Sequence, residues 1–308
     1  MIKAIFIIGP TASGKTSVSI ELAKRFNGEI ISADSMQIYK GIHIASAAPN
    51  DSEKEGIPHH LIEFLNLDDE FSVADYVKMA RSSIRNIHSR GKLPIIVGGT
   101  GLYISSLLEN IEYTDQKTDY KLRQKLESEF DLIGGEKMLE KLREFDSDSA
   151  LRLHPNNRRR IIRAFEVFYL TGKTITEQNL LSKQNKSEIE PLVIGLNFAN
   201  REVLYKRIND RVDKMLESGL LEEARQSFNN NLKSGAFQAI GHKELYPHII
   251  GEIPLEDAVE SLKMSTRRYA KRQITWFKNV ENVNWFYLDK GDTLDDMVLL
   301  SEKFLKEK

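Results

Sequence analysis

The chain of 308 residues has no cysteine. That absence excludes disulfide bonds, thiolate nucleophiles and zinc sites with cysteine ligands. The sequence also has no apolar run that approaches the roughly 18 residues of a membrane-spanning helix. The apolar start over residues 1–8 is closed by Gly9-Pro10 and lacks the basic start and the cleavage site of a signal peptide. We therefore expect a cytoplasmic protein with no membrane partner.

The chain has almost no net charge, because 44 lysines and arginines oppose 45 aspartates and glutamates. A protein that binds polyanions with its whole surface is usually basic, so any nucleic-acid site must be a local patch. Hydrophobic residues make up 41% and charged residues 29%, which is typical of a soluble globular protein. The length predicts about two domains.

Short β-branched runs alternate with helical patterns along most of the chain. The runs predict strands over residues 5–8, 29–33, 93–97, 192–198 and 283–288. Ser72 has the character of an N-cap for one of the helices between them. This alternation predicts an α/β fold with a mostly parallel, doubly wound sheet, as in P-loop NTPases.

The stretch over residues 111–191 breaks the alternation, since it is polar, helical in pattern and without a clear strand. We predict that it is an inserted all-helical domain. The core would then be discontinuous, formed by residues 1–110 and 192–308. The polar segment 182–190 is typical of a linker.

A phosphate-binding P-loop follows the first predicted strand and precedes a helix. Its residues are Gly9, Pro10, Thr11, Ala12, Ser13, Gly14, Lys15 and Thr16. Successive backbone N–H groups and a helix N-terminus can face one anionic group, to which Lys15 adds a positive charge. The hydroxyl of Thr16 can hold Mg²⁺. The pattern indicates phosphate or diphosphate binding without identifying the molecule, and a glycine turn that binds nothing is the alternative.

Two further segments end at the same edge of the predicted sheet. Asp34 follows the second strand and could be a general base, a metal partner or only a capping residue. Gly98-Gly99-Thr100-Gly101 follows the third strand, where glycines allow close backbone approach and Thr100 offers a hydroxyl. A plain turn explains this second segment equally well. Ligands of open α/β sheets bind at the carboxyl ends of the strands, which favours the functional interpretation of Asp34.

Arg207 and Arg211 are four residues apart on one predicted helix and therefore share a face. Two arginines on one face suit a diphosphate clamp, while a solvated charged face is the alternative. His59-His60 shows no partner at metal-ligand spacing, which favours ordinary structural histidines.

Two local basic patches remain. Residues 151–173 hold six basic residues and one acidic residue, and residues 263–278 hold six basic residues and none that is acidic. The second patch also contains Tyr269, Trp276 and Phe277. Clustered cations neutralise nucleic-acid phosphates and aromatic rings can stack on bases. Solvated helices with core aromatics are the alternative, but two such patches in a nearly neutral chain favour RNA binding.

With these residues in place, the chain resembles a known family, the tRNA dimethylallyltransferases, also called tRNA isopentenyltransferases. The resemblance covers nearly the whole chain and rests on blocks in the family's order. These blocks are GPTASGKT (9–16), DSMQIYKG (34–41), PHHLIE (58–63), LPIIVGGTGLYI (93–104), LHPNNRRRIIRAFEVFYLTGK (153–173), AFQAIGHKE (236–244) and TRRYAKRQITWF (266–277).

The resemblance implies transfer of a dimethylallyl group from dimethylallyl diphosphate to N6 of adenosine 37 of tRNA, just 3′ of the anticodon. The products would be N6-isopentenyladenosine and diphosphate, with Mg²⁺ assisting at Thr16. The P-loop would hold a leaving group, and no ATP hydrolysis would be involved. Asp34 matches the family's general base, and Thr100 and Arg207 match its other catalytic positions.

The resemblance also implies which residues face the tRNA, and that the inserted domain grips the anticodon stem-loop. The implied contacts are Asp34, Ser35, Met36, Gln37, Thr100, Arg123, Arg159, Arg160, Ile161, Ile162, Arg163, Gln238, Ala239, Ile240, Gly241, His242, Lys243 and Glu244. We expect the protein to act as a monomer.

The match has departures. His43-Ile44-Ala45-Ser46-Ala47-Ala48-Pro49 stands where the family usually has Asp-Ile-Gly-Thr-Ala-Lys-Pro, so a glycine and a lysine are lost. Asn157 stands where the family more often has Asp, and His242 stands where Tyr is commoner. These changes put the contacts of the 43–49 loop in doubt but remove no proposed catalytic group.

Three different functions are also compatible with these residues. An adenylate isopentenyltransferase would prenylate free nucleotides, and it would not need an insert that grips RNA. A P-loop small-molecule kinase is the second, and a non-catalytic RNA-binding protein is the third. The two basic patches and the long 153–173 block favour tRNA.

Overall fold

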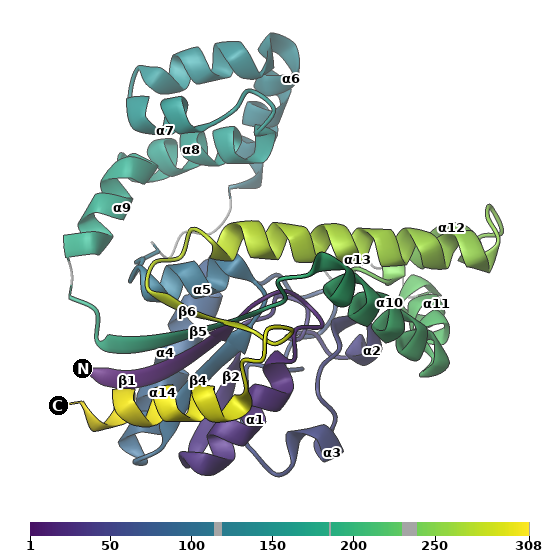
Figure 1. Ribbon diagram of the computed structural model, residues 1–308. Helices are drawn as coiled ribbons and strands as arrows, with labels where there is room; N and C mark the ends of the chain where they lie inside the picture. Colours follow the sequence, from purple (N-terminus) through teal and green to yellow (C-terminus); the bar gives the residue numbers. More distant parts are fainter. Residues whose placement is uncertain (114–118, 185, 230–238, 308) are drawn as a thin grey trace. The chain divides into compact units, whose positions relative to one another are not determined.

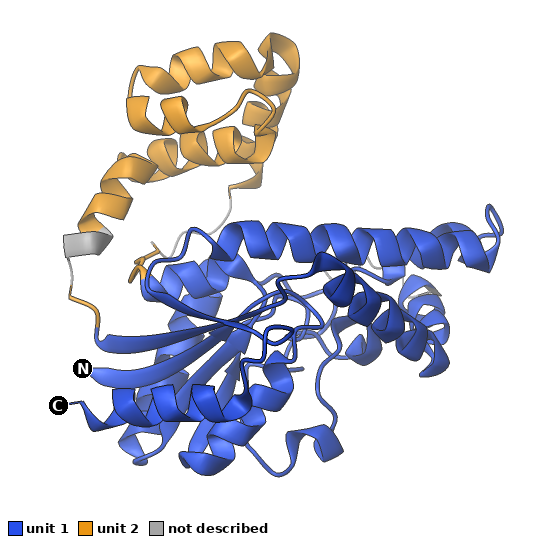
Figure 2. Ribbon diagram, viewed as in Figure 1, with its two compact units in different colours: residues 1–108, 188–308 blue, residues 109–187 orange. Residues whose placement is uncertain are grey.

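A computed structural model describes residues 1–113, 119–184, 186–229 and 239–307. The chain divides into two compact units, which Figure 2 shows in different colours. Unit 1 comprises Met1–Leu108 and Glu188–Lys308, and unit 2 comprises Glu109–Ser187.

Unit 1 is built on a six-stranded parallel sheet (Figure 1). The strands are β1 (Ile2–Ile8), β2 (Gly28–Ser32), β3 (His59–His60), β4 (Leu93–Gly98), β5 (Ile189–Asn197) and β6 (Val283–Tyr287). Their order in the sheet is β3-β2-β4-β1-β5-β6, and every pairing is parallel. The predicted α/β fold with a parallel sheet is confirmed. Sequence reasoning missed only the two-residue β3, which is too short to show a pattern.

Helices cover the sheet on both faces. The helices of unit 1 are α1 (Lys15–Arg25), α2 (His43–Ser46), α3 (Asp51–Lys54), α4 (Val73–Ser89), α5 (Gly101–Leu108), α10 (Arg201–Glu217), α11 (Leu220–Asn229), α12 (His242–Ile249), α13 (Leu255–Phe277) and α14 (Leu294–Lys306). On one face, α1 and α14 pack on Ile5 and Ile7. Successive strand residues point to opposite faces, so Phe6 and Ile8 face the other side. There α4 packs on β1, β2 and β4.

The predicted N-cap at Ser72 is confirmed. Its side chain accepts a hydrogen bond from the backbone N–H of Asp75, and the Asp75 carboxylate accepts one from the backbone N–H of Ser72. This reciprocal capping box satisfies two backbone donors that a helix start would otherwise leave without partners.

Unit 2 contains only helices among its described residues. These are α6 (Tyr120–Arg143), α7 (Ser147–Arg152), α8 (Arg158–Thr171) and α9 (Ile175–Gln184). They enclose a separate apolar core around Leu126, Met138, Leu142 and Phe165. The predicted boundary at residue 191 differs from the observed one, because β5 already begins at Ile189 and Ile2 pairs with Ile189 in the sheet.

Among the described residues, no helix has both the length and the apolar character needed to cross a lipid bilayer. The same part of the chain holds no group of three histidines, cysteines or acidic residues that could bind a metal ion.

His59 and His60 lie in β3, and their rings contact the Ile57 carbonyl and the Glu29 carboxylate, respectively. Both histidines are therefore structural in this fold.

Glu29, at the start of β2, is a buried carboxylate surrounded by basic side chains. Its two oxygens accept from the Arg90 guanidinium at 2.5 and 2.6 Å, from Lys92 Nζ at 2.8 Å and interact with His60 Nε2 at 2.7 Å. The hydrogen bonds from Arg90 hold the pKa of Glu29 well below its usual value, against the opposing effect of burial. This cluster joins β2, β3 and the segment before β4.

We predict that Glu29→Gln lowers the free energy of unfolding by about 3 kcal/mol at pH 7, because it leaves three basic groups around a neutral side chain. The depressed pKa means that the carboxylate stabilises the fold above its unfolded pKa of about 4.3. That contribution is lost as the pH falls toward the folded pKa.

Denaturant unfolding from pH 7 to pH 3 checks this, with the exposed Glu281→Gln as the control. The difference between Glu29→Gln and the wild type should shrink as the pH falls below about 4. A difference that stays constant over that range contradicts the electrostatic explanation.

Candidate functional site

Three neighbouring strands end together at the carboxyl edge of the sheet. β2 is followed by Asp34, β4 by Gly99-Thr100, and β1 by the P-loop, and the sheet places these strands side by side in the order β2-β4-β1. The structure therefore brings together the three segments that the sequence placed at one edge. Ligands of open α/β sheets bind at such an edge.

The P-loop has the backbone conformation of an anion cradle. Gly9, Ala12 and Gly14 have φ angles of 148°, 62° and 92°, and helix α1 begins directly afterwards at Lys15. A Cβ on Gly9 would lie 2.4 Å from the carbonyl oxygen of Leu196, so only glycine fits there. The Ser13 hydroxyl is buried and has no hydrogen-bond partner in the described chain. The loop thus offers an unused hydroxyl and a helix N-terminus to one ligand.

Lys15 is held within the loop itself. Its Nζ donates to the carbonyl oxygens of Gly9 at 3.0 Å and Pro10 at 2.7 Å. Burial, with a smaller contribution from the charge of Arg211, lowers the pKa of Lys15 to about 7, while Asp34 acts in the opposite direction. A bound anion would favour the charged form of this amine.

The segment that carries Asp34 is fixed by hydrogen bonds to its neighbours. Asp34 Oδ1 accepts from the backbone N–H of Met36 at 2.9 Å, which closes a local turn. Thr100 Oγ1 accepts from the backbone N–H of Ser35 at 2.9 Å, and the backbone N–H of Thr100 donates to the Ala33 carbonyl. The alternative of a helix-capping Asp is wrong, because the residues after Asp34 form a turn and not a helix. The other oxygen of Asp34 accepts no hydrogen bond from the described residues.

Three tyrosines lie within electrostatic range of Asp34. Burial raises the pKa of Tyr76, Tyr103 and Tyr269, and the Asp34 carboxylate adds to the increase in each case. The rings of Tyr76 and Tyr103 stack with centroids 3.9 Å apart. Tyr76 lies on α4, Tyr103 on α5 and Tyr269 on α13. The carboxylate also interacts electrostatically with Lys15 and Arg211.

The two arginines of α10 occupy different positions. Arg207 is exposed, and its Nε donates to the Ala12 carbonyl at 2.9 Å while its guanidinium lies 5.3 Å from the Phe198 ring centre. Arg211 lines a cavity of about 400 Å³ together with Thr16. Burial lowers the pKa of Arg211, and Asp34 opposes that shift. Of the two, Arg211 lines the cavity, whereas Arg207 contacts the P-loop through Ala12.

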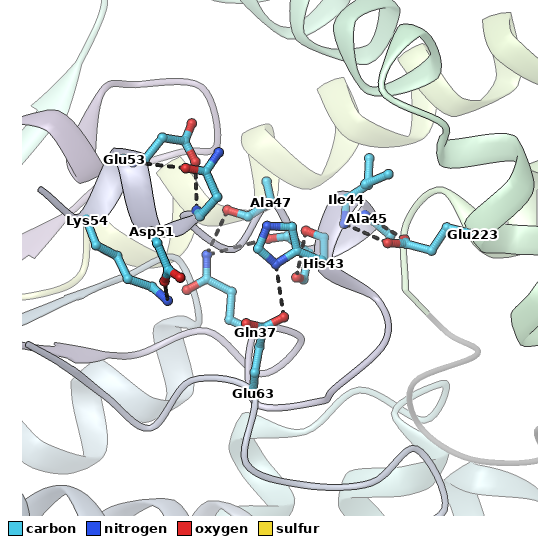
Figure 3. A network of polar contacts seen from close by, with 12 residues as sticks. Gln37, His43, Ile44, Ala45, Ala47, Asp51, Glu53, Lys54, Glu63 and Glu223 are labelled. Atoms are coloured by element: carbon cyan, nitrogen blue, oxygen red, sulfur yellow. Dashed lines mark hydrogen bonds and ion pairs between the residues drawn. The ribbon is translucent and has the colours of Figure 1, made fainter.

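The loop that departs from the family pattern borders this cavity, where Ala47, Ala48 and Pro49 line the wall. Gln37 Nε2 donates to the Ala47 carbonyl at 3.1 Å, as Figure 3 shows. Glu223 of α11 accepts the backbone N–H groups of Ile44 and Ala45 at 2.7 and 2.9 Å. The loop is thus fixed by carboxylate and amide contacts.

The 238–244 segment, predicted to face tRNA, is mostly buried in the described chain. Ala239, His242 and Glu244 are at most 5% exposed. His242 Nε2 lies 3.1 Å from Glu223 Oε1, which explains part of that burial. Lys243 is exposed, and Gln238 lies outside the described residues. Of these side chains, Lys243 is the one open to a large partner.

In unit 2, α8 divides its predicted contacts between surface and core. Arg159 and Arg160 are exposed. Ile161 and Ile162 are also predicted to face tRNA, and their side chains belong to the apolar core of the unit, at 0% and 4% exposure. The 3.6-residue period of a helix turns these two positions inward.

Arg123 and Arg163 of unit 2 share one buried acid. Arg123 Nε and Nη2 donate to Glu166 at 2.6 and 3.0 Å, and Arg163 Nη1 donates to it at 3.3 Å. Both guanidinium groups stay partly exposed. Glu166 therefore holds them in place on α6 and α8 without removing them from the surface.

The basic α13 holds contacts that sequence reasoning missed. Gln273 joins the P-loop to the loop after β4, because its Oε1 accepts from the Thr11 N–H and its Nε2 donates to the Gly99 carbonyl. Of the aromatics predicted to stack on bases, Phe277 is in the core, Tyr269 is half-buried and Trp276 is exposed. Gln273 lies in the TRRYAKRQITWF block, but the sequence does not show which loops the inward face of this helix contacts.

The donor groups at the cavity fit a magnesium diphosphate. Thr16 is exposed there, and Glu21, Glu53 and Glu55 add carboxylate oxygens to the lining. Mg²⁺ prefers oxygen ligands and commonly binds through one or two protein groups together with substrate phosphates. A magnesium site at this cavity would therefore be completed only when the diphosphate binds.

Comparison with known proteins identifies the relatives of the chain. A family model described as IPP transferase matches residues 37–280. A tRNA dimethylallyltransferase of Caldanaerobacter subterraneus subsp. tengcongensis is 46% identical over 299 residues, which cover 96% of this chain and 95% of that protein. A tRNA dimethylallyltransferase of Acetivibrio thermocellus is 48% identical over 306 residues, covering 99% and 97%.

Solved structures give the same result. A full-length tRNA isopentenylpyrophosphate transferase from Bacillus halodurans has 42% sequence identity and a TM-score of 0.73, covering 99% of this chain and 96% of that one. A eukaryotic dimethylallyltransferase acting on tRNA has 32% identity and a TM-score of 0.85, covering 99% and 80%. The similarity thus extends over both units.

We predict that Lys15→Met weakens binding of inorganic diphosphate with Mg²⁺ by about tenfold to a hundredfold, because a charge-assisted hydrogen bond is lost. Titration calorimetry measures the dissociation constant. Lys306→Met removes an exposed lysine of α14, away from the P-loop in the chain, and should leave binding unchanged. Equal affinities of Lys15→Met and wild type would show that the loop does not hold the diphosphate.

Proposed function

The chain belongs to the IPP transferase family, and we propose that it transfers a dimethylallyl group from dimethylallyl diphosphate to N6 of adenosine 37 of tRNA. The products are N6-isopentenyladenosine and diphosphate. The observation that carries this proposal is the shared sheet edge, where an anion cradle on β1 and a carboxylate on β2 lie two strands apart. The kinship with tRNA dimethylallyltransferases over the whole chain supports the choice of substrates.

The P-loop would stabilise the departing diphosphate. As the allylic C–O bond breaks, negative charge grows on the diphosphate oxygens, and donors aimed at that charge lower the barrier. We assign this role to the backbone N–H groups of Ala12, Gly14, Lys15 and Thr16, the Ser13 hydroxyl, the Lys15 side chain and Arg211. Pro10 has no N–H, and the N–H of Thr11 donates to Gln273. Arg207 would act indirectly, because its hydrogen bond to the Ala12 carbonyl holds the P-loop in place.

Magnesium would bind with the diphosphate, held from the protein side by Thr16. When bound, it supplies positive charge that neutralises the leaving group. The acidic lining of the cavity at Glu53 and Glu55 suits water molecules of such an ion.

Asp34 would accept the proton of the adenine amine. The N6 lone pair is delocalised into the ring, so the amine becomes an effective nucleophile only as its proton is removed. Asp34 Oδ1 is engaged with the Met36 N–H, which leaves the other oxygen to face the base. Thr100 would help to place the adenine beside this carboxylate, since its hydroxyl fixes the adjoining Ser35 N–H.

The buried tyrosines around Asp34 would keep water from the reacting carbon. An allylic carbon with cationic character is captured by water unless the site is dry. Tyr76 and Tyr103 supply stacked aromatic surface at this position. The transferred group would therefore lie among Tyr76, Tyr103 and Tyr269.

The exposed cations of both units would bind the tRNA backbone. In unit 2 these are Arg123, Arg159, Arg160 and Arg163, and in unit 1 they are Lys243 and the outer face of α13 with Arg268, Lys271 and Arg272. Ser35, Met36 and Gln37 would line the place of the flipped adenosine, since a base must leave the stack to react. We expect the protein to act as a monomer in the cytoplasm, where its tRNA substrate occurs.

Adenylate isopentenyl transfer remains the alternative activity, because it needs the same P-loop and the same base. The helical unit favours tRNA, since a free nucleotide requires no second unit with exposed arginines. A kinase would require a phosphate acceptor at the position that Asp34 and the buried tyrosines occupy.

We predict that the wild type, given dimethylallyl diphosphate and Mg²⁺, prenylates unmodified tRNA and not AMP. Asp34→Asn should reduce turnover about a thousandfold, because the isosteric amide keeps the turn but cannot take the proton. Chromatography of nucleosides after digestion measures the product, and diphosphate affinity shows that the site is intact. Prenylated AMP with untouched tRNA would overturn the choice of substrate.

We predict that Arg159→Ala combined with Arg160→Ala weakens tRNA binding and lowers the slope of log affinity against log salt by about 1.5, because two phosphate contacts are lost. Binding is measured over a series of salt concentrations. Lys303→Ala combined with Lys306→Ala, on α14, is the control and should leave the slope unchanged. An unaltered slope in the arginine variant would remove this surface from the RNA.

A further inference from the structure

Gln273 is a buried amide that contacts two loops of the site at once. It is 5% exposed, and its Oε1 accepts from the backbone N–H of Thr11 at 2.8 Å. Its Nε2 donates to the carbonyl oxygen of Gly99 at 3.0 Å. A primary amide has a hydrogen-bond acceptor and a donor on the same carbon, so one side chain can satisfy both backbone groups.

The fit around this amide is tight. A Cβ on Gly99 would lie 2.1 Å from Gln273 Nε2, so the residue before Thr100 has room for no side chain while the amide is in place. The Tyr269 hydroxyl, one turn earlier on α13, interacts with the side chains of both Thr100 and Gln273. The inner face of α13 is therefore shaped to the loop after β4.

The contact joins the two halves of the proposed site. Thr11 belongs to the loop that would hold the diphosphate. Gly99 precedes Thr100, whose hydroxyl accepts from the Ser35 N–H beside Asp34. Among the described side chains, Gln273 alone hydrogen-bonds to the backbone of both loops.

We propose that Gln273 is a positioning residue, which sets the distance between the prenyl donor on the P-loop and the adenine at Asp34. The proposal rests on the proposed function. Transfer requires the allylic carbon and N6 to approach in a defined geometry, and a displacement of about 1 Å lowers such rates about a hundredfold. Each substrate, by contrast, binds mainly to its own loop.

If Gln273 sets the distance between the two substrates and binds neither, its loss should change the transfer rate and not the affinities. An amide that only stabilised the fold would not give this result. Gln273→Leu should leave the dissociation constants of magnesium diphosphate and of tRNA close to those of the wild type. The single-turnover rate of prenyl transfer should fall about a hundredfold. A residue that only stabilised the fold would lower the unfolding midpoint without changing the rate per folded molecule.

The experiment compares wild type, Gln273→Leu and Gln226→Leu, a matched control that removes an exposed glutamine of α11. Single-turnover transfer and both dissociation constants are measured at saturating folded protein. Hydrogen exchange over residues 9–16 and 98–101 gives a readout that needs no activity, and exchange should rise in both segments for Gln273→Leu. Gly99→Ala, which crowds the same amide, should reproduce the slow transfer.

The outcomes separate the two proposals. A wild type that transfers no prenyl group overturns the proposed function, and the exchange data then still test whether Gln273 joins the loops. Transfer by Gln273→Leu at the wild-type rate overturns the positioning role. So does a rate loss fully explained by weaker diphosphate binding, or unchanged exchange in either segment.

Discussion

The parallel pairing of β2 with β4 and of β4 with β1 determines where the P-loop, Asp34 and Thr100 lie. Ile5 pairs with Ile95, and Ile30 pairs with the same Ile95, so three strands are held in one register and end together. Because these strands are buried on both faces, a shift in register would move apolar side chains throughout the core. The chemistry at the edge is therefore set by the packing of the sheet, and not by the loops themselves.

The sequence predicts best those residues whose role follows from their immediate neighbours in the chain. The P-loop and Asp34 were predicted from position, because a strand followed by a glycine loop or an acid is a local signal. The sequence also predicted Arg207 and Arg211 as a pair, but the different positions of these two arginines required the structure. So did the contacts of Gln273, which depend on where α13 packs. Ile161 and Ile162 lie inside a basic block, yet the helical period places them in the core. A sequence block shared with a family therefore does not show which of its residues contact tRNA and which lie in the apolar core.

The altered loop over residues 43–49 shows how a departure from the family pattern is accommodated. Without the usual glycine, Ala45 still presents its backbone N–H, and Glu223 accepts it together with that of Ile44 (Figure 3). His43, in place of the usual aspartate, pairs with Glu63 at 2.9 Å. Ala48, in place of the usual lysine, leaves Arg211 as the one basic residue among those lining the cavity.

The most direct test of the central claim is the stoichiometry of the leaving group. The protein is incubated with dimethylallyl diphosphate, Mg²⁺ and unmodified tRNA, and diphosphate, orthophosphate and prenylated adenosine are quantified together. A P-loop that cradles a leaving group predicts one diphosphate released for each adenosine modified, and no orthophosphate. Orthophosphate release, or diphosphate release without base modification, would contradict it.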